Sequence, residues 1–357
     1  MKKKSLNAKK TIHKNLQKHL SNPKIKVIYK NFEKLLINKK ISGNLAVAVS
    51  GGPDSLALTF LAKCYSTLNN IKINYYHLDH GLRVNSEKEA KTLKLKLSKY
   101  DINCKILKWK GKKPKTNIQA IARKNRYNLL INQCVKDKIK TILIAHHIND
   151  LYENFLLRLL RGSGLKGLTS FSSVNSEAKL NSNKNISILR PLIDQDKKSL
   201  LYIVKFVFNF YLNDPSNDNL DFKRTRIRNL LNNLKNEGLD EKKLKLTINN
   251  LTQSSIAIDY YVKKNIKLNS NFTKVDNKFK CIINKEFFEN PKEVVFRSMG
   301  EILQKISGNY YAARGKSMMN LLRRIKSKKF NKMTLSGCII EKINNSWIIY
   351  DEKSKKI

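Results

Sequence analysis

The sequence predicts an α/β fold with a doubly wound parallel sheet, followed by a helical linker and a smaller C-terminal domain. Short apolar runs alternate with helix-like segments between residues 25 and 217, which is the pattern of strands and helices that wind around a parallel sheet. A glycine-rich turn follows the first apolar run, and polar residues gather where later runs end. Because such sheets bind ligands at the carboxyl ends of their strands, we expect the functional site there.

The elements of this pattern can be placed in order along the chain. Leu45–Val49 is continuously apolar and ends at the glycine-rich turn, as expected of a buried parallel strand. Three further strands are predicted at residues 71–77, 102–107 and 141–145. A helix is predicted after each strand: from about residue 54 through 61, from a cap at Asn85 or Ser86 through 97, from a cap at Asn117 through 134, and from about 149 to 160.

The chain divides into three parts by composition. Residues 1–24 carry many lysines and no acidic residue, so we expect a basic tail that is partly disordered or helical. Residues 25–217 hold the alternating pattern and form the expected sheet domain. Residues 218–357 are basic, and are mainly helical at first, with short strands later. This last part is predicted to be a linker and a second domain.

The charge balance points to a polyanionic partner. The 72 lysines and arginines exceed the 27 aspartates and glutamates by 72 − 27 = 45, a surplus that attracts nucleic acid. An AT-rich genome also favours lysine, so part of this charge needs no function. The 13 arginines are more informative, because none precedes Arg83 and nine lie between Arg83 and Arg228. Arginine binds anions with a planar fork that lysine lacks, so we expect the anion chemistry in that region.

Composition also argues against membrane and secreted classes. No stretch reaches the roughly 18 consecutive apolar residues of a membrane helix, and no export signal is recognised. None of the five cysteines belongs to a Cys-x-x-Cys pair. We therefore expect a reduced, cytoplasmic protein with no membrane partner. The sequence does not determine the oligomeric state, and a homodimer is one of the states that it allows.

The glycine-rich turn has the residues of a nucleotide-binding loop: Ser50, Gly51, Gly52, Pro53, Asp54 and Ser55. The two glycines let the backbone approach phosphate oxygens, and the N–H groups that begin the following helix attract anions. Asp54 can hold the Mg²⁺ of a nucleotide, and the two serine hydroxyls are further donors. No Gly-Lys-Ser/Thr follows, so this is not a Walker A loop. The alternative is a plain glycine turn with an aspartate cap.

A second polar block, Tyr75–Arg83, follows the next predicted strand. Its residues His77, Asp79 and His80 suggest a metal site, but no cysteine is near and their spacing matches no known zinc pattern. We therefore expect His77 and His80 to shape the floor of the nucleotide site, with Arg83 near a phosphate.

A third polar block, Ile144–Glu153, follows the fourth predicted strand and contains two adjacent histidines. Asp150 and Glu153 are three residues apart, so they share one face of the first helical turn. Two carboxylates at the end of a strand can orient Mg²⁺ or bind an amine. The alternative is that they only complement the positive end of the helix dipole.

Two groups of basic residues are candidates for RNA contacts: Arg158, Arg161 and Lys166, and Arg224, Arg226 and Arg228. The first group flanks a glycine-rich turn that follows a helix, and we expect it to face RNA phosphates. The arginines of the second group alternate along the chain, so on a helix they would spread around it. They would then contact several phosphates or bridge two domains. The alternative for the second group is a solvated basic face.

Taken in order, these blocks resemble the tRNA(Ile)-lysidine synthetase family of PP-loop ATP pyrophosphatases. The matching motifs are Ala46–Ser55, His80–Arg83, Ala122-Arg123, Arg126-Tyr127, His146–Asp150, Leu156–Leu165, Arg190-Pro191-Leu192, Asp214-Pro215-Ser216-Asn217, and Arg224, Arg226, Ile227 and Arg228. The first motif is common to the superfamily, whereas the full series is specific. The chain departs from the family at Asn149 and Asn154, where members often have Asp and Thr, and it matches only loosely after about residue 240.

The resemblance implies an adenine nucleotide alpha hydrolase-like fold and a two-step ligation. ATP would activate O2 of the wobble cytidine as an adenylate, in the isoleucine tRNA that has a CAU anticodon, and pyrophosphate would be released. The amine of free lysine would then attack C2 and displace AMP. The product, lysidine, changes decoding from AUG to AUA.

The resemblance also implies roles for particular residues. The implied catalytic residues are Asp54, Arg126, Asp150 and Glu153. The implied ATP-binding residues are Ser50, Gly51, Gly52, Pro53, Asp54, Ser55, His77 and His80. The aspartate of the loop would hold Mg²⁺, the arginine would stabilise developing charge, and the two helix carboxylates would hold lysine or remove its proton. The two basic groups and residues 218–357 would bind the tRNA.

Two alternatives stay open from the sequence. A tRNA thiolase of the same superfamily would use cysteines, often in Cys-x-x-Cys pairs, and the sequence has no such pair. A non-catalytic RNA-binding relative would not need the carboxylates Asp54, Asp150 and Glu153, and all three are present.

Overall fold

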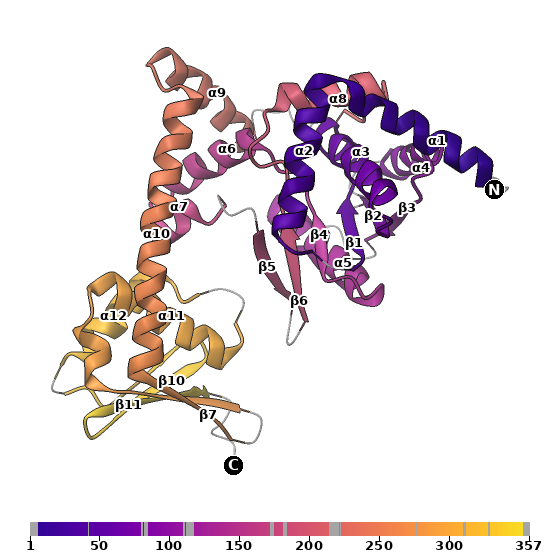
Figure 1. Cartoon of the computed structure of the whole chain (residues 1–357). Helices are drawn as coiled ribbons and strands as arrows, with labels where there is room; N and C mark the ends of the chain where they lie inside the picture. The colour runs from indigo at the N-terminus through magenta and orange to yellow at the C-terminus, as the bar shows by residue number, and fades with distance from the viewer. Residues whose placement is uncertain are drawn as a thin grey trace. The chain divides into compact units, whose positions relative to one another are not determined.

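The chain forms two compact units in a computed structural model (Figure 1). The structure describes residues 6–41, 43–79, 81, 85–109, 111, 118–171, 175–180, 184–213, 221, 223–275, 278–309, 312–327 and 329–352. The first unit comprises Met1–Leu180 and Lys184–Ile248, and the second comprises Asn181–Asn183 and Asn249–Ile357.

This division falls later than the boundary expected near residue 217, because two further helices pack with the first unit. Helix α9 (Lys223–Asn236) contacts α6 (Ile148–Leu159). The Tyr152 hydroxyl of α6 donates a hydrogen bond of 2.9 Å to the Glu241 carbonyl, which begins α10 (Glu241–Asn269). Helix α10 continues into the second unit.

A six-stranded sheet in the order β3-β2-β1-β4-β6-β5 forms the centre of the first unit. Its strands are β1 (Leu45–Ala48), β2 (Ile73–Asp79), β3 (Cys104–Lys108), β4 (Thr141–Leu143), β5 (Asn175–Leu180) and β6 (Lys184–Leu189). Five strands are parallel, and β5 is an antiparallel edge strand. Strand β1 pairs with β2 on one side and with β4 on the other, so the strand order reverses beside β1.

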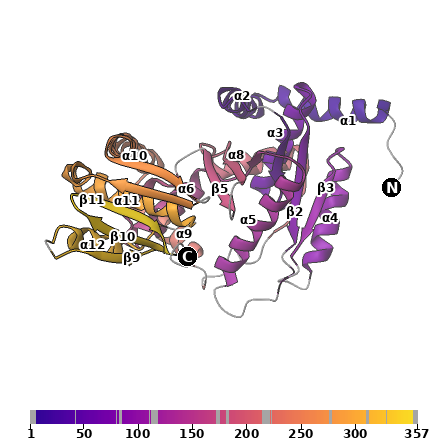
Figure 2. The ribbon, with the colours of Figure 1, turned by 90° about the horizontal axis from the view of Figure 1, so that it is seen from below.

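Helices cover both faces of this sheet (Figure 2). The helices of one face are α2 (Pro23–Asn38), α3 (Pro53–Leu68), α4 (Ser86–Ser98) and α8 (Lys197–Val207), and the opposite face is covered by α5 (Ile118–Lys136). Successive strand residues alternate between the two cores, with Val47 in the first and Ala46 in the second. The predicted doubly wound fold is therefore confirmed.

The predicted strands and the helices after them are confirmed with small shifts at their ends. The strand predicted at 71–77 is β2 at Ile73–Asp79, and the helix predicted from a cap at Asn85 or Ser86 is α4 at Ser86–Ser98. The expected cap Asn117 lies outside the described residues. The structure adds three features that the sequence did not predict: the β5–β6 hairpin, the short helix α7 (Leu165–Thr169), and α8.

The second unit has an antiparallel sheet in the order β7-β8-β11-β10-β9. Its elements are β7 (Ser270–Val275), β8 (Lys278–Ile283), α11 (Lys292–Ser307), α12 (Gly315–Ile325), β9 (Lys332–Leu335), β10 (Cys338–Ile343) and β11 (Ser346–Asp351). Arg297 of α11 is buried and joins two carboxylates, at 2.9 Å from Asp259 and 2.8 Å from Glu293. The ion pair of Arg297 with Asp259 links α11 to the second half of α10. Among the described helices, none combines the length and apolar character needed to cross a bilayer.

The part of the expected basic tail that the structure describes is packed against the sheet domain. Helix α1 (Leu6–Lys18) buries Leu16 in the core shared by α2 and α3. Asn22 then caps α2, because its side chain accepts hydrogen bonds from the N–H groups of Lys24 and Ile25. Pro23 therefore begins a helix, as proline does readily at a first helical position.

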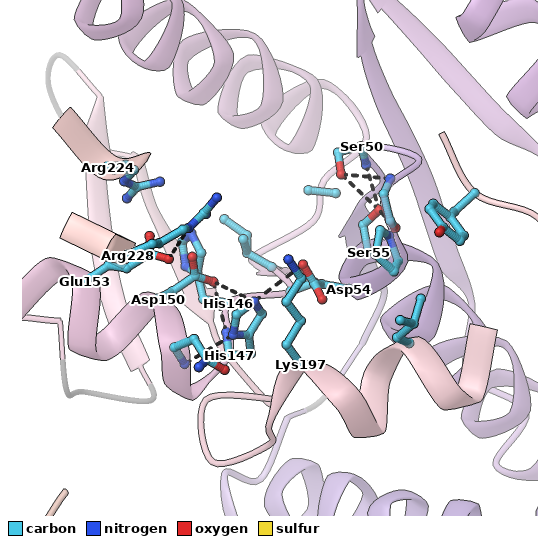
Figure 3. A pocket seen from close by; sticks show the side chains of 18 of the residues that line it. Ser50, Asp54, Ser55, His146, His147, Asp150, Glu153, Lys197, Arg224 and Arg228 are labelled. Carbon is cyan, nitrogen blue, oxygen red and sulfur yellow. Dashed lines mark hydrogen bonds and ion pairs between the residues drawn. The ribbon is translucent and has the colours of Figure 1, made fainter. Parts of the chain in front are cut away.

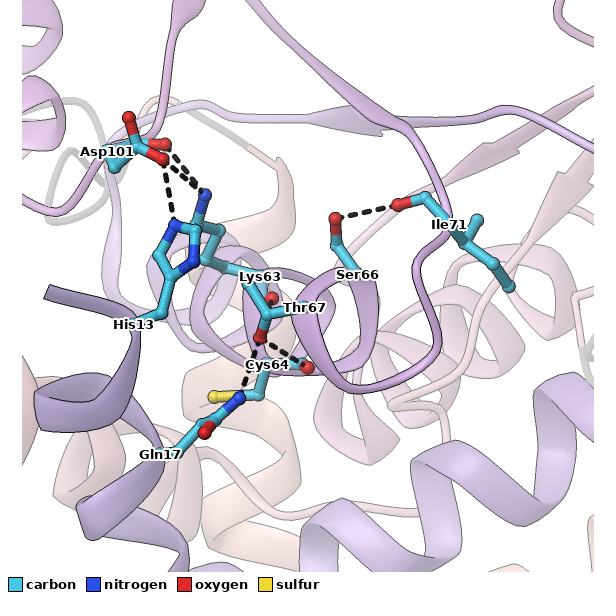
Figure 4. A network of polar contacts seen from close by, with 8 residues as sticks. All are labelled: His13, Gln17, Lys63, Cys64, Ser66, Thr67, Ile71 and Asp101. Carbon is cyan, nitrogen blue, oxygen red and sulfur yellow. Dashed lines mark hydrogen bonds and ion pairs between the residues drawn. The ribbon is translucent and has the colours of Figure 1, made fainter. Parts of the chain in front are cut away.

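Polar contacts reinforce this packing (Figure 4). His13 of α1 lies 2.8 Å from the Asp101 carboxylate, which also accepts a bond of 3.1 Å from the Lys63 ammonium of α3. The Gln17 amide donates to the Thr67 hydroxyl at 3.1 Å. A helix whose exposed face is rich in lysine is thus held through its opposite face.

Substitution Leu16→Ala should destabilise the first unit by about 2–5 kcal/mol, because it removes a buried side chain and leaves a cavity. Urea unfolding should report the loss, and hydrogen exchange should show that the amides of α1 become less protected. Lys14→Ala on the exposed face of the same helix is the control and should have little effect. Equal stability of the two variants would show that α1 does not pack as described.

Candidate functional site

A pocket of about 990 Å³ opens at the carboxyl edge of the sheet, where the strand order reverses. The loops that follow β1 and β4 line it from either side of the reversal, and side chains of α5, α6, α8 and α9 complete the wall (Figure 3). Ligands bind at this reversal in open α/β sheets, because the loops on its two sides leave in opposite directions and open a crevice.

The loop 50–55 is organised from within by Ser55. Its buried hydroxyl oxygen accepts hydrogen bonds from the N–H groups of Ser50 and Gly51, at 3.1 and 3.0 Å, and donates to the Gly52 carbonyl at 2.9 Å. Ser55 is thus committed to the shape of the loop, although the sequence suggested a donor to phosphate. The first turn of α3, whose N–H groups lack helical partners, is suited to an anion.

Gly51 is required by both its backbone and its surroundings. Its φ of +92° lies in the left-handed region that residues with side chains rarely adopt, and a Cβ there would lie 2.6 Å from Cδ1 of Leu212. Because the N–H of Leu212 donates to the Gly51 carbonyl at 2.9 Å, the segment after α8 lies directly against the loop.

Asp54 faces His147. This histidine ends the loop after β4 and is the N-cap residue of α6. Oδ2 of Asp54 lies 3.5 Å from Nε2 of His147, while Oδ1 is buried and has no hydrogen-bond partner among the described residues. Nδ1 of His147 accepts from the N–H of Asn149 at 3.2 Å, and the backbone N–H of His147 donates to Asp150 at 3.2 Å. The neutral ring therefore carries its proton on Nε2, directed toward the carboxylates.

Opposing influences set the pKa of His147. Burial lowers it, but the hydrogen bond to Asp54 and the charges of Asp150, Asp54 and Glu153 outweigh burial, so the pKa is raised above 6.5. Nε2 lies 3.7 Å from Asp150. The histidine thus binds the loop of β1 and the helix after β4 to each other.

Glu153 forms an ion pair with Arg228, which lies 75 residues later on α9. Nε of Arg228 donates to Oε1 of Glu153 at 2.6 Å. The Glu153 side chain is 3% exposed, and its Oε2 is buried without a hydrogen-bond partner among the described residues. The expected RNA-contacting arginine is therefore part of the pocket wall.

The other two arginines of that group lie on different sides of α9. Arg224 is one turn before Arg228 and also lines the pocket. Arg226 is exposed, lies outside the pocket lining, and donates to the Asp221 carbonyl at 3.0 Å. The helical period separates the three residues, so only two of them can act on a ligand in the pocket.

His77 lines the pocket from the end of β2. Its Nδ1–H donates to the Val49 carbonyl at 2.8 Å, which leaves Nε2 as an acceptor. Burial lowers the pKa of His77, and the bond to Val49 only partly opposes this effect. The ring is therefore neutral at neutral pH. Arg126 of α5 also lines the pocket, with its guanidinium carbon 5.7 Å from the centre of the Tyr127 ring.

The other expected residues either fall outside the described residues or do not line the pocket. His80 and Arg83 are outside the described residues. Arg158, Arg161 and Lys166 are described but do not line the pocket, and Nε of Arg158 donates to the Asn154 side chain at 2.9 Å.

Three residues of the pocket wall, His146, His147 and Lys197, were not named as site residues from the sequence. Nδ1 of His146 accepts from Nε of the buried Arg190 at 3.1 Å, and Phe171 packs against both side chains. The adjacent histidines were visible in the sequence, but a partner 44 residues away was not. Lys197 of α8 also lines the pocket, and in the sequence it is one lysine among many.

The pocket does not contain a ready-made site for a resident metal. The described residues include no group of three or more His, Cys, Asp or Glu side chains arranged to hold one. Asp54 nevertheless has a buried oxygen with no hydrogen-bond partner among them. Mg²⁺ that arrives with a nucleotide needs only one or two protein carboxylates, because phosphates and water supply the other ligands. The arrangement fits a nucleotide-borne ion.

Comparison with known proteins agrees with this geometry. Residues 23–235 match the family of PP-loop domains. This range contains the loop 50–55 and every pocket element up to α9. A U34-tRNA thiolase from Methanococcus maripaludis has a similar structure, with a TM-score of 0.53 and 18% identity over 64% of this chain and 79% of that one. At that identity the likeness establishes the fold alone.

Sequence similarity extends beyond the PP-loop domain. The tRNA(Ile)-lysidine synthase of Wolbachia pipientis is 33% identical over 319 residues, which cover 88% of this chain and 72% of the relative. That of Rickettsia felis is 32% identical over 315 residues, covering 88% and 70%. Because this identity includes the PP-loop domain and most of the chain beyond it, the chain belongs to the tRNA(Ile)-lysidine synthase family.

Proposed function

We propose that the protein joins the amine of free lysine to C2 of the wobble cytidine in the isoleucine tRNA with a CAU anticodon, and splits ATP into AMP and pyrophosphate. The main support is that one pocket holds two chemically different regions (Figure 3). The loop 50–55 and the N-terminus of α3 suit an anion. Asp150 and Glu153 on α6 suit a cation such as an ammonium group.

ATP lies across the β1 and β2 strand ends with its triphosphate at the N-terminus of α3. Ala48 and Leu78 line the strand side of the pocket, where an adenine ring can pack, and Nε2 of neutral His77 can accept a hydrogen from it. Asp54 would hold the Mg²⁺ of the nucleotide through its unpartnered Oδ1. That ion, when bound, offsets negative charge on the departing pyrophosphate.

In the first step, O2 of the cytidine attacks the α-phosphorus of ATP. The bond from that phosphorus to the bridging oxygen breaks, and pyrophosphate leaves with the electron pair. Arg126 lines the pocket and stabilises the charge on the α-phosphate. The wobble base reaches the pocket because anticodon bases lie in a single-stranded loop and can leave their stack.

In the second step, the lysine amine attacks C2, and AMP leaves with the O2 oxygen. The amine must be held near the adenylate and must lose a proton. Asp150 and Glu153 provide the carboxylates, and Oε2 of Glu153 is a buried acceptor without a partner among the described residues. Arg228 holds one oxygen of Glu153 through its Nε–H and leaves the other oxygen for a ligand. Asn149 in place of an aspartate leaves this group intact.

The tRNA backbone is bound by basic residues outside the reacting centre. Arg158 lies in the last turn of α6, Arg161 follows that helix and Lys166 lies on α7. Arg226 is exposed on α9, outside the pocket lining. A net charge of +45 makes such binding strong and dependent on salt. We place the protein in the cytoplasm, where tRNA is modified and where its five free, buried cysteines stay reduced.

The test is incubation of the protein with ATP, labelled lysine and a CAU-anticodon isoleucine tRNA, with mass analysis of the wobble nucleoside at the end. Lysine should be added to that nucleoside, and sustained pyrophosphate release should require both tRNA and lysine. Pyrophosphate release without either partner, or no release at all, would contradict the proposal.

Substitution Asp54→Asn should reduce lysine transfer by at least roughly a hundredfold, because it removes the charge proposed to hold Mg²⁺. The rate of pyrophosphate release in the presence of tRNA and lysine is the measurement. Asp194→Asn is a suitable control, because that carboxylate is exposed and lies outside the pocket lining. Equal activity in the two variants would remove Asp54 from the mechanism.

Substitution Arg228→Met should lower lysine transfer by roughly ten- to a hundredfold, the range for loss of one hydrogen bond between charged groups. The Michaelis constant for lysine should rise, because Glu153 loses the group that orients it. Arg226→Met on the same helix is the matched control and should affect only tRNA binding. If Arg226→Met impaired lysine use as strongly, the proposed role of the Glu153–Arg228 pair would be wrong.

The stability of the protein should depend on pH through His77. Its pKa in the folded state is below the ordinary value of 6.5, so the unfolded state binds a proton more readily between those two values. Neutral His77 makes its full contribution to the free energy of unfolding above about pH 6.5. This contribution is lost as the pH falls from there toward the lower pKa of the folded state. The free energy of unfolding of the wild type, minus that of His77→Gln, should therefore decrease on acidification. A difference that grows on acidification would show that the pKa is shifted the other way.

A further inference from the structure

Lys197 reaches into the nucleotide end of the pocket from the first turn of α8. The residue lines the pocket, and Figure 3 shows its side chain extending toward Asp54, on the same side as the loop of Ser50 and Ser55. Two helix N-termini, those of α3 and α8, therefore meet this end of the pocket, and a lysine projects from the second.

The position of this lysine is unfavourable for the helix that carries it. Cations at the first turn of a helix are repelled by the positive end of its dipole. Asp196 just before it caps the helix, because its two carboxylate oxygens accept bonds from the N–H and the hydroxyl of Ser199, at 2.8 Å each, so the acidic residue of this turn serves the backbone of α8. No ion pair of Lys197 with Asp54 or with any other described residue is formed. The side chain of Lys197 is exposed where it lines the pocket, so its ammonium is available to an anion that binds there.

Arg126 is already assigned to the α-phosphate, and the cations of α9 lie at the other end of the pocket. Arg228 is paired with Glu153, and Lys235 lies 3.1 Å from Glu241. Arg224 lies beside Arg228 in Figure 3, away from the loop 50–55. Of these cations, Lys197 is the one directed at the region where the triphosphate is proposed to lie.

We propose that Lys197 binds the β- and γ-phosphates of ATP and stabilises the charge that develops on pyrophosphate as it leaves. This role rests on the proposed function. When the bond between the α-phosphorus and the bridging oxygen breaks, the electron pair goes to that oxygen, which belongs to the departing pyrophosphate. The ammonium of Lys197 contacts this group and donates hydrogen bonds to it, and no proton is transferred.

Three variants test the assignment: Lys197→Met, Lys197→Arg and Lys198→Met. The last is a matched control, since Lys198 is the next residue of the same helical turn, is exposed, and lies outside the pocket lining. Binding of ATP and of AMP to the full-length protein is measured by calorimetry, with no tRNA or lysine present. Unfolding temperature is recorded for each variant.

Lys197→Met should weaken ATP binding by roughly ten- to a hundredfold and leave AMP binding unchanged, because AMP lacks the phosphates that Lys197 contacts. Lys197→Arg should retain most of the ATP affinity. The unfolding temperature of Lys197→Met should not fall, because the lost charge opposed the dipole of α8. This combination of weaker ATP binding and undiminished stability does not arise from a purely structural role.

Two results would overturn the assignment. One is an ATP affinity in Lys197→Met that matches Lys198→Met, and the other is an equal loss of ATP and AMP binding. Both measurements are independent of the transfer reaction. If the wild type bound ATP as predicted but added no lysine to tRNA, the proposed function would fail while the Lys197 contact would stand.

Discussion

The reversal of strand order beside β1 is the constraint on which the site depends. Strand β1 pairs with β2 on one side and β4 on the other, so the loops after β1 and β4 enter the same crevice from opposite sides. This places Asp54 at 3.5 Å from His147, although 93 residues separate them (147 − 54). His147 also caps α6, so the same contact sets the position of Asp150 and Glu153. The nucleotide loop and the carboxylates are thus aligned by the sheet itself.

Several polar atoms of the pocket are left unsatisfied, and their grouping supports a ligand rather than a stable core. Oδ1 of Asp54, Oδ1 of Asn149 and Oε2 of Glu153 are buried acceptors without a hydrogen-bond partner among the described residues. An unpaired buried polar atom typically costs about 1–3 kcal/mol, so such atoms are rare unless something binds them. All three belong to pocket residues. A metal-bound nucleotide and an amine would supply partners for these atoms, so their binding would stabilise the folded protein.

The sequence predicted the part of this protein that depends on local pattern. The apolar run before Ser50, the glycines after it, and the spacing of Asp150 and Glu153 were sufficient to predict the sheet, the loop and the shared helix face. The β5–β6 hairpin was not predicted, because its residues Asn175–Leu180 and Lys184–Leu189 include many polar side chains and lack the apolar run of a buried strand. Contacts between distant residues, such as Glu153 with Arg228, carry no local signal and required the fold.

The central claim is that one pocket has a nucleotide end at the loop 50–55 and an amine end at Glu153. A crystal structure with Mg²⁺ and a non-hydrolysable ATP analogue tests this claim most directly. The triphosphate should lie at the N-terminus of α3, with the metal on Asp54 and the adenine near His77. A triphosphate bound against Glu153 and Arg228, or a nucleotide outside this pocket, would contradict the account.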